Sequence, residues 1–340
     1  MTDDCNQMNT ESKKKLVEKA LDVLGDQEGN CALCPRECGV DRRRAADGFC
    51  RSGAQASVSR ALLHFGEEPV LSGYEDWKKR KGAGGGARAG SGTIFFSGCN
   101  LKCLFCQNYQ ISWLQEGRPV TDDELAGMML GLQAQGALNI NLVSPTHVLL
   151  PILRALRLAL DRGLSLPIVY NTNGYEKASV VRRLEGIVDV YLPDLKYFSP
   201  QVSKRLSGAA DYFEQAGPSI LEMSRQQPRL VLDGNEVAER GLIIRHLVLP
   251  HYHRESLSVL DWIKANVPPG FGLSLMSQYH PCHRAPEEMR RKLSAAEYSE
   301  VVAKAEELDF EQAFIQPEAF GPDEHFLPDF ERDDPFGWEE

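Results

Sequence analysis

Short apolar runs alternate with helical stretches over residues 93–316, and this alternation is what most constrains the fold. Two capping boxes, Thr121 with Glu124 and Ser294 with Glu297, mark helix starts. The apolar runs are short enough to be buried parallel strands. They are residues 93–97, 139–144, 167–171, 188–193, 242–250, 272–277 and 313–316. The pattern predicts an α/β fold of right-handed βαβ units, as a partial or full barrel or an open doubly wound sheet.

Polar or metal-binding residues follow several of these runs. In a barrel of parallel strands, the chemistry takes place at the carboxyl ends of the strands. Cys99, Asn171, Asp194 and His251 all stand at such ends. We therefore expect them to lie on one rim of the barrel.

Three cysteines, Cys99, Cys103 and Cys106, fall within eight residues directly after the first of these strands. Thiolates are soft ligands that suit the iron of iron–sulfur clusters. A structural zinc site is closed by four ligands, so three cysteines leave one position open. On a 4Fe–4S cluster, that open iron can bind an external chelator. The alternatives are a zinc site completed by a distant histidine or by Cys282, and three unrelated buried thiols.

A second cysteine set, Cys31, Cys34, Cys38 and Cys50, supplies four thiolates in one short segment. This number and spacing indicate a closed metal site. Zinc would stabilise a segment that is too small to have its own core. An auxiliary iron–sulfur cluster could instead pass electrons or bind substrate. The spacing leaves both metals open, and the closed shell favours a structural or auxiliary role over a second catalytic one.

The stretch "GCNLKCLFCQN" resembles the signature of radical S-adenosylmethionine (radical SAM) enzymes. Further pieces in order, among them "CALCPRECGVDR", "HFGEEP", "YNTNGYE", "YLPDLKY" and "SQYHP", resemble the pyruvate formate-lyase activating-enzyme branch. The resemblance is closest to uncharacterised relatives with a cysteine-rich N-terminal segment, and it covers roughly residues 30–316. It implies a partial or full (β/α) barrel of the radical SAM type with a small N-terminal metal-binding appendage.

The resemblance also implies a mechanism and its cofactors. Cys99, Cys103 and Cys106 would bind three irons of a 4Fe–4S cluster, and S-adenosylmethionine would chelate the fourth through its amine and carboxylate. An electron donor such as flavodoxin or ferredoxin would reduce the cluster. Cleavage of S-adenosylmethionine would then release methionine and a 5′-deoxyadenosyl radical, which abstracts hydrogen from a protein, peptide or small-molecule substrate.

Several cofactor-binding residues follow from the same resemblance. Phe105 matches an aromatic residue that packs near the adenine, although it could equally be a core residue. Asn171, Asn173, Asp194 and Lys196 match positions around the methionyl carboxylate or an associated cation. Asp194 and Lys196 are two residues apart on a strand end and so point to the same side, which suits recognition of an amino-acid zwitterion. A structural ion pair is the alternative.

The chain departs from the family after the second strand. The usual Gly-Gly-Glu segment is absent, and residues 144–147, "SPTH", stand in its place. Thr146 or His147 could replace its contacts to the amine. His147 could instead cap the following helix.

Composition and charge exclude other classes of protein. The apolar fraction is 42%, and no apolar run approaches the roughly 18 residues that span a bilayer. The N-terminus has neither the apolar core of a signal peptide nor the acid-poor character of a transit peptide, which predicts a cytoplasmic protein. The formal charge of −10 lies mostly in residues 318–340, and the basic runs at 42–44 and 77–81 are short. We therefore expect neither a membrane nor a nucleic-acid partner.

The expected organisation has four parts. Residues 1–60 form a helix and the four-cysteine segment, 61–92 a connector with a Gly-rich loop, 93–316 the barrel core and 317–340 an acidic tail. Three functions remain open: activation of a glycyl-radical enzyme, radical modification of another peptide or small molecule, and a non-catalytic iron–sulfur redox or binding protein.

Overall fold

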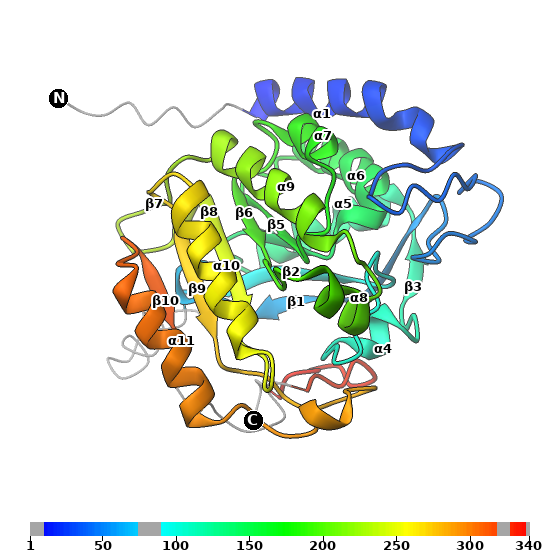
Figure 1. Cartoon of the computed structure of the whole chain (residues 1–340). Coiled ribbons are helices and arrows are strands. Elements are labelled where there is room, and N and C mark those ends of the chain that lie inside the picture. Colours follow the sequence, from blue (N-terminus) through cyan, green and yellow to red (C-terminus); the bar gives the residue numbers. More distant parts are fainter. Residues whose placement is uncertain (1–9, 74–89, 318–326, 338–340) are drawn as a thin grey trace.

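The computed structural model describes residues 10–73, 90–317 and 327–337, and their strands form one sheet (Figure 1). Most of the Gly-rich stretch and the basic run at 77–81 lie outside the described residues. The strands are β1 Ala56–His64, β2 Ser91–Phe96, β3 Arg118–Val120, β4 Ile140–Val143, β5 Ile168–Thr172, β6 Val190–Pro193, β7 Val231–Leu232, β8 Ala238–Leu247, β9 Gly272–Met276 and β10 Ala313–Ile315.

The sheet is mostly parallel. Its order is β10-β9-β8-β6-β5-β4-β2-β1-β3, with β7 paired to β8. Every pair from β2 to β10 along this path is parallel, whereas β1 is antiparallel to both β2 and β3. The path ends at β3 and β10, which do not pair with each other in the described part of the chain. This confirms the α/β fold and its partial-barrel form.

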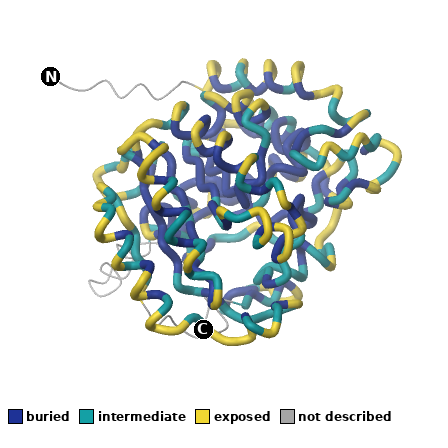
Figure 2. The backbone as a smooth tube through the Cα atoms, in the orientation of Figure 1, coloured by how far each residue is buried: buried dark blue, intermediate teal, exposed yellow. Residues whose placement is uncertain are grey.

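The longer helices cover the outer side of the sheet (Figure 1). The helices of the described residues are α1 Thr10–Leu24, α2 Pro69–Ser72, α4 Tyr109–Ser112, α5 Asp122–Ala134, α6 Leu149–Asp161, α7 Ala178–Val181, α8 Pro200–Ser207, α9 Tyr212–Gln226, α10 His253–Asn266 and α11 Ala295–Glu307. All residues of β4, β5 and β6 are buried, because helices cover one face and the barrel interior covers the other (Figure 2). No helix in the described residues is both long and apolar enough to cross a bilayer.

The sequence patterns locate most of these elements. All seven expected strands are present, and the two expected capping boxes begin α5 and α11. The sequence analysis did not identify β1, β3, β7 or α8 to α10. Because β1 pairs with β2, the sheet begins at Ala56, well before the expected start of the barrel core at residue 93.

The N-terminal segment packs directly on the barrel. Val17, Ala20 and Leu24 on α1 are buried in the same core cluster as the apolar face of α6. Lys13 Nζ lies 2.5 Å from Asp189 Oδ2, next to β6. Residues 29–55 then run as turns and loops past the carboxyl ends of the strands.

Residues 327–337, here called the C-terminal strap, pack beside β2 and α4. Phe330 and Phe336 pack against Phe95 of β2, with ring centroids 5.3 and 5.6 Å away. Gln110 of α4 donates to Asp329 Oδ1 at 3.0 Å and accepts from the Phe330 N–H at 2.9 Å. The strap therefore lies beside the loop that carries Cys99, Cys103 and Cys106 (Figure 1).

Candidate functional site

The cysteine loop, residues 97–108, follows β2 at its carboxyl end. Gly98 has φ of +90°, and a Cβ on it would lie 2.8 Å from the carbonyl oxygen of Cys50. Only glycine combines this backbone conformation with so close an approach. The turn at Gly98 sends the rest of the loop back over the strand ends.

Each of the three sulfurs in the cysteine loop has a polar partner. Ser207 Oγ donates to Cys103 Sγ at 3.0 Å, and Ser112 Oγ lies 3.2 Å from Cys106 Sγ. Cys99 Sγ accepts from the Leu101 N–H at 3.4 Å and from Asn173 Nδ2 at 3.3 Å. Hydrogen bonds of this kind stabilise negative charge on sulfur and adjust the potential of iron–sulfur clusters. The donor set thus fits thiolates bound to iron.

Without iron, Cys99 and Cys106 hold their thiol protons at neutral pH. Burial raises the pKa of Cys106 to about 12, and burial also raises the pKa of Cys99. Loading a cluster therefore releases protons at neutral pH.

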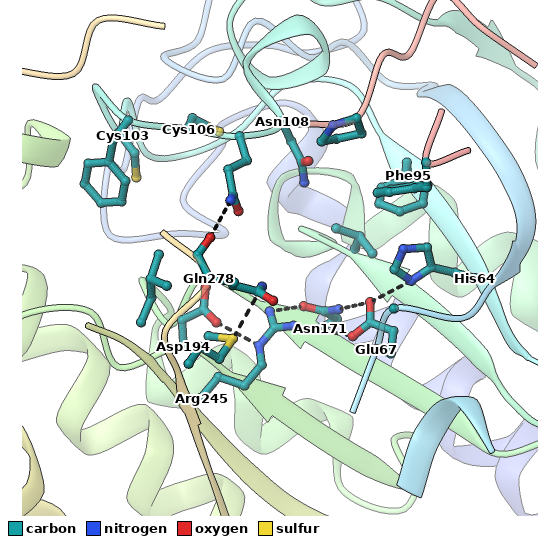
Figure 3. Close-up of a pocket in the computed structure, with 18 of the residues that line it drawn as sticks. His64, Glu67, Phe95, Cys103, Cys106, Asn108, Asn171, Asp194, Arg245 and Gln278 are labelled. Atoms are coloured by element: carbon teal, nitrogen blue, oxygen red, sulfur yellow. Dashed lines mark hydrogen bonds and ion pairs between the residues drawn. The ribbon is translucent and has the colours of Figure 1, made fainter. Parts of the chain in front are cut away.

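A cavity of about 260 Å³ lies between the cysteine loop and the carboxyl ends of the strands. Cys103, Phe105 and Cys106 line one side of it. Asn171, Asp194, Lys196, Arg245 and Glu67 line the other, and Figure 3 shows Asn171, Asp194, Arg245 and Glu67 across from the labelled cysteines. The fold thus brings two of the three cysteines of the loop together with Phe105 and three of the predicted polar residues.

Asp194 is the centre of a charged network in this cavity. Its Oδ2 accepts from Lys196 Nζ at 2.5 Å, and its Oδ1 accepts from Arg245 Nε at 2.8 Å. Burial alone would raise the pKa of Asp194, but the charges of Arg245 and Lys196 hold it below its ordinary value. Asp194 is therefore ionised at neutral pH. The structure brings Asp194 and Lys196 together as expected, and the two side chains form an ion pair.

The sequence analysis assigned no role to Arg245, Glu67 or His64, although each lines the cavity. Arg245 Nη2 donates to Asn171 Oδ1 at 2.6 Å, and its Nη1 lies 3.5 Å from Glu67 Oε2. His64 is buried, and burial lowers its pKa to about 3, so the ring is neutral. A signal for Arg245 was present: an arginine inside the apolar run "LIIRHLVLP" must find a partner if that run is buried.

Thr146 and His147 are buried but are not among the residues that line the cavity. The Thr146 hydroxyl donates to Glu176 Oε1, and His147 Nε2 lies 2.8 Å from the carbonyl oxygen of Ser97. Asn173 contacts Cys99 Sγ and Asn100 Oδ1 and does not line the cavity either. Contacts of these three residues with a cofactor stay predictions.

His251 also lies outside the cavity lining. Its backbone N–H donates to Glu297 Oε1 at 2.7 Å, on the side of α11. The shared rim predicted from the strand ends thus includes Asn171 and Asp194 but not the His251 side chain.

The four N-terminal cysteines lie close to this site. Cys31, Cys34 and Cys50 are buried, and all eight cysteines in the described residues are free thiols. Among the described residues, no three His, Cys, Asp or Glu side chains lie close enough to share one metal ion. The metal sites predicted from the two cysteine sets stay predictions.

Comparisons with known proteins support the sequence motif. A profile of the radical SAM superfamily matches residues 93–216. The uncharacterised protein MJ0674 of Methanocaldococcus jannaschii is 31% identical over 311 residues, which cover 88% of this chain and 81% of that protein.

Two solved structures match part of this chain. SuiB of Streptococcus suis, bound to its precursor peptide SuiA, matches with a TM-score of 0.43 at 14% identity, over 64% of this chain and 46% of that one. Native anSMEcpe with bound AdoMet matches with a TM-score of 0.43 at 14% identity, over 62% of this chain and 57% of that one. The matched region thus spans about half the length of each solved chain. The chain therefore belongs to one family with MJ0674, and its residues 93–216 match the radical SAM superfamily.

Proposed function

We propose that this chain binds S-adenosylmethionine in the cavity beside the cysteine loop and uses it to abstract a hydrogen atom from a substrate. One observation carries the proposal: Cys103 and Cys106 line the same cavity as the Asp194–Lys196 ion pair. A cluster and an amino-acid zwitterion bound there would share one small volume. The radical SAM superfamily supplies the cofactors, a 4Fe–4S cluster and S-adenosylmethionine.

In this proposal Cys99, Cys103 and Cys106 hold the cluster. When bound and reduced, the cluster supplies the electron that breaks a carbon–sulfur bond of S-adenosylmethionine. The hydroxyls of Ser207 and Ser112 hydrogen-bond with two of the sulfurs and keep them oriented. Ser207 and Ser112 contact only cysteine sulfurs. The iron that lacks a cysteine ligand would therefore stay free to bind S-adenosylmethionine.

The opposite side of the cavity would orient the cofactor. Asp194 would accept a hydrogen bond from the methionyl amine, and Lys196 would pair with the methionyl carboxylate. Phe105, whose ring centroid is 5.8 Å from that of Tyr279, provides an apolar surface for the adenine. Phe95 and Phe336 also line the cavity and limit the access of water to a radical.

The narrower hypothesis of glycyl-radical activation rests on the ordered motifs that resemble activating enzymes. It is tested by incubating the reduced protein with a candidate glycyl-radical enzyme and recording the electron paramagnetic resonance (EPR) spectrum of the partner. A glycyl signal supports it. Hydrogen transfer from a labelled peptide or small molecule into 5′-deoxyadenosine supports the broader reading instead.

The first test of the cleavage reaction measures 5′-deoxyadenosine from anaerobically reconstituted, dithionite-reduced protein supplied with S-adenosylmethionine. We expect product from the wild type and none from Cys103→Ala, because the variant loses a ligand of the open site. Cys282→Ala is the matched control: this thiol contacts the carbonyl of Phe105 at 3.5 Å but belongs to neither cysteine set. Full product from Cys103→Ala would refute the site assignment.

A further inference from the structure

A pocket of about 590 Å³ lies beside the start of β1, and among the described residues it shares no lining residue with the cavity beside the cysteine loop. Its wall consists of residues between 42 and 57, Ser97 just after β2, and residues between 115 and 119. We call it the arginine pocket, because Arg42, Arg43 and Arg51 line it. Its volume is typical of sites for small molecules, which measure roughly 300–1,000 Å³.

The arginine pocket carries a net positive charge. Three arginines line it, whereas no aspartate or glutamate among the described residues does so. The ion-pair partner of Arg43 is Asp41, whose Oδ1 lies 2.9 Å from Arg43 Nε. The same carboxylate lies 3.4 Å from Arg44 Nε, so two guanidinium groups share one negative charge. Arg42 and Arg51 have no carboxylate partner in the part of the chain that the structure describes. The pocket therefore suits an anion.

One of these charges is fixed in the wall. Arg42 is 6% exposed, and its Nη1 donates to the carbonyl oxygen of His147. Its Nε and Nη2 donate to Cys31 Sγ at 3.1 Å and to Cys50 Sγ at 3.5 Å. Burying a guanidinium is costly unless negative charge lies near it. An anion in the pocket would supply that charge.

The residues after Arg51 add hydrogen-bond donors that no protein group uses. Within residues 10–73, 90–317 and 327–337, nothing accepts from the backbone N–H groups of Ser52, Gly53 and Ala54. The Ser52 hydroxyl has no hydrogen-bond partner in these residues either, although Ser52 is only 8% exposed. All three residues line the pocket. Buried polar groups are normally paired, and successive backbone N–H groups form anion-binding concavities. These donors therefore indicate a ligand with several acceptor oxygens.

From these observations we propose that the arginine pocket binds a small molecule through its phosphate group. A phosphate ester carries a charge of roughly −1.5 to −2 near pH 7, and it has several acceptor oxygens. Guanidinium groups bind such oxygens in pairs. Arg51, which is exposed at the rim, would bind the phosphate together with the hydroxyl and N–H groups of residues 52–54. The proposal does not rest on the proposed function, because the pocket and the cavity are separate.

The position of the site gives the basic run at 42–44 a use other than nucleic-acid binding. Arg42 and Arg43 face one pocket of limited volume, whereas a nucleic acid needs basic residues along an extended surface. Arg44 does not line the pocket among the described residues, and its side chain is 86% exposed. The run thus divides into two residues at the pocket and one in solvent.

Calorimetric titration of the anaerobically reconstituted full chain tests the ligand class. The probes are inorganic phosphate, glycerol 3-phosphate and succinate, a dianion that has carboxylates only. We expect glycerol 3-phosphate to bind at one site per chain and succinate not to bind. Equal binding of inorganic phosphate would identify free phosphate as a sufficient ligand and supports the same chemistry. Binding of succinate as tightly as the phosphates, or no binding of either phosphate, overturns the proposal.

Variants test the place of binding. Arg51→Gln and Ser52→Ala should each weaken binding of glycerol 3-phosphate by about tenfold, the effect of losing one hydrogen bond to a charged group. Ser52→Ala removes a hydroxyl that has no protein partner in the described residues, so the fold should be kept. Arg44→Gln is the matched control, because it removes one charge from the same run outside the pocket, and it should bind as the wild type does. Unchanged binding in the first two variants, or equal weakening in all three, overturns the site.

Hydrogen exchange locates the anion without any substitution. Saturating glycerol 3-phosphate should slow exchange of the amides of residues 52–54, because their N–H groups gain acceptors. Exchange in α11 should not change. A bound phosphate that leaves exchange at residues 52–54 unaltered would lie elsewhere on the protein, and the assignment of the arginine pocket would be wrong.

Discussion

At the scale of single residues, Glu176 is an unusual buried acid. Its side chain is fully buried, and its Oε1 accepts from the hydroxyls of Thr146 and Thr172. Burial raises the pKa of this carboxyl from 4.5 to about 7. Glu176 thus joins the segment that replaces Gly-Gly-Glu to the end of β5. The two hydroxyl hydrogen bonds favour the ionised carboxylate, but burial outweighs them and favours the protonated form.

This shift predicts a pH dependence of stability. Because the folded pKa lies above the unfolded value, the native state binds the proton more tightly between pH 4.5 and 7. The free energy of unfolding should therefore fall as pH rises through this window, by on the order of 3 kcal/mol. Glu176→Gln keeps an oxygen that accepts from the threonine hydroxyls but cannot ionise. Its free energy of unfolding should therefore lack this fall with rising pH.

The measurement compares unfolding midpoints of the wild type and Glu176→Gln across pH 5 to 8. Glu306→Gln, on the exposed side of α11, is the control and should follow the wild type. Parallel curves for the wild type and Glu176→Gln would mean that Glu176 does not titrate in this range.

At the scale of elements, the C-terminal strap packs against β2 beside the cavity. Phe330 and Phe336 are 2% and 6% exposed, and they pack with Phe95 in a small apolar cluster separate from the main core. Phe336 also lies 4.3 Å from the ring of His64, ring centroid to ring centroid. The strap therefore forms part of the cavity wall.

We expect the double variant Phe330→Ala and Phe336→Ala to release the strap from β2. Removing a buried phenylalanine costs about 3 kcal/mol or more, and this cluster has few other members to hold the strap. Hydrogen exchange of residues 91–96 should become faster, while exchange in the helices on the far side of the barrel should not change. Phe198→Ala is the control, since Phe198 is 39% exposed on the loop before α8. Unchanged exchange in β2 would show that the strap does not protect it.

At the scale of the whole molecule, the N-terminal segment and the barrel share one core. Val17 of α1 is fully buried in the main cluster, whereas Val23 on the same helix is 46% exposed. Arg154 of α6 also binds Glu28, just after α1, and Asp122 at the start of α5. The N-terminal segment and the barrel, which appear separate in the sequence, are thus expected to unfold together.

Val17→Ala tests this shared core. We expect it to lower the thermal midpoint of the reconstituted protein in a single transition, because the cavity costs about 2 kcal/mol. Val23→Ala should stay within roughly 0.5 kcal/mol of the wild type. If Val17→Ala produced an early transition of the N-terminal segment alone, the segment would be an independent unit.

The elements of the barrel could be predicted because their signals are local. The buried runs of β4, β5 and β6 and the capping boxes of α5 and α11 each lie within a few residues of chain, as does the spacing of the cysteine loop. Short edge strands such as β3 and β7, with three and two residues, are too brief to show a period. Their existence depends on the strand that pairs with them.

Contacts between distant residues could be read only from the folded chain. Arg245 meets Glu67 across 178 positions of sequence, and Arg36 meets Asn100 across 64. The strap reaches α4 across more than 200. The sequence by itself determined the α/β alternation and the cysteine motif of the radical SAM type, since strand periodicity and ligand spacing are short-range properties. Which charges line the cavity, and which cysteine set touches the other, was decided by the tertiary structure, because packing the helices on a curved sheet determines which distant strand ends meet.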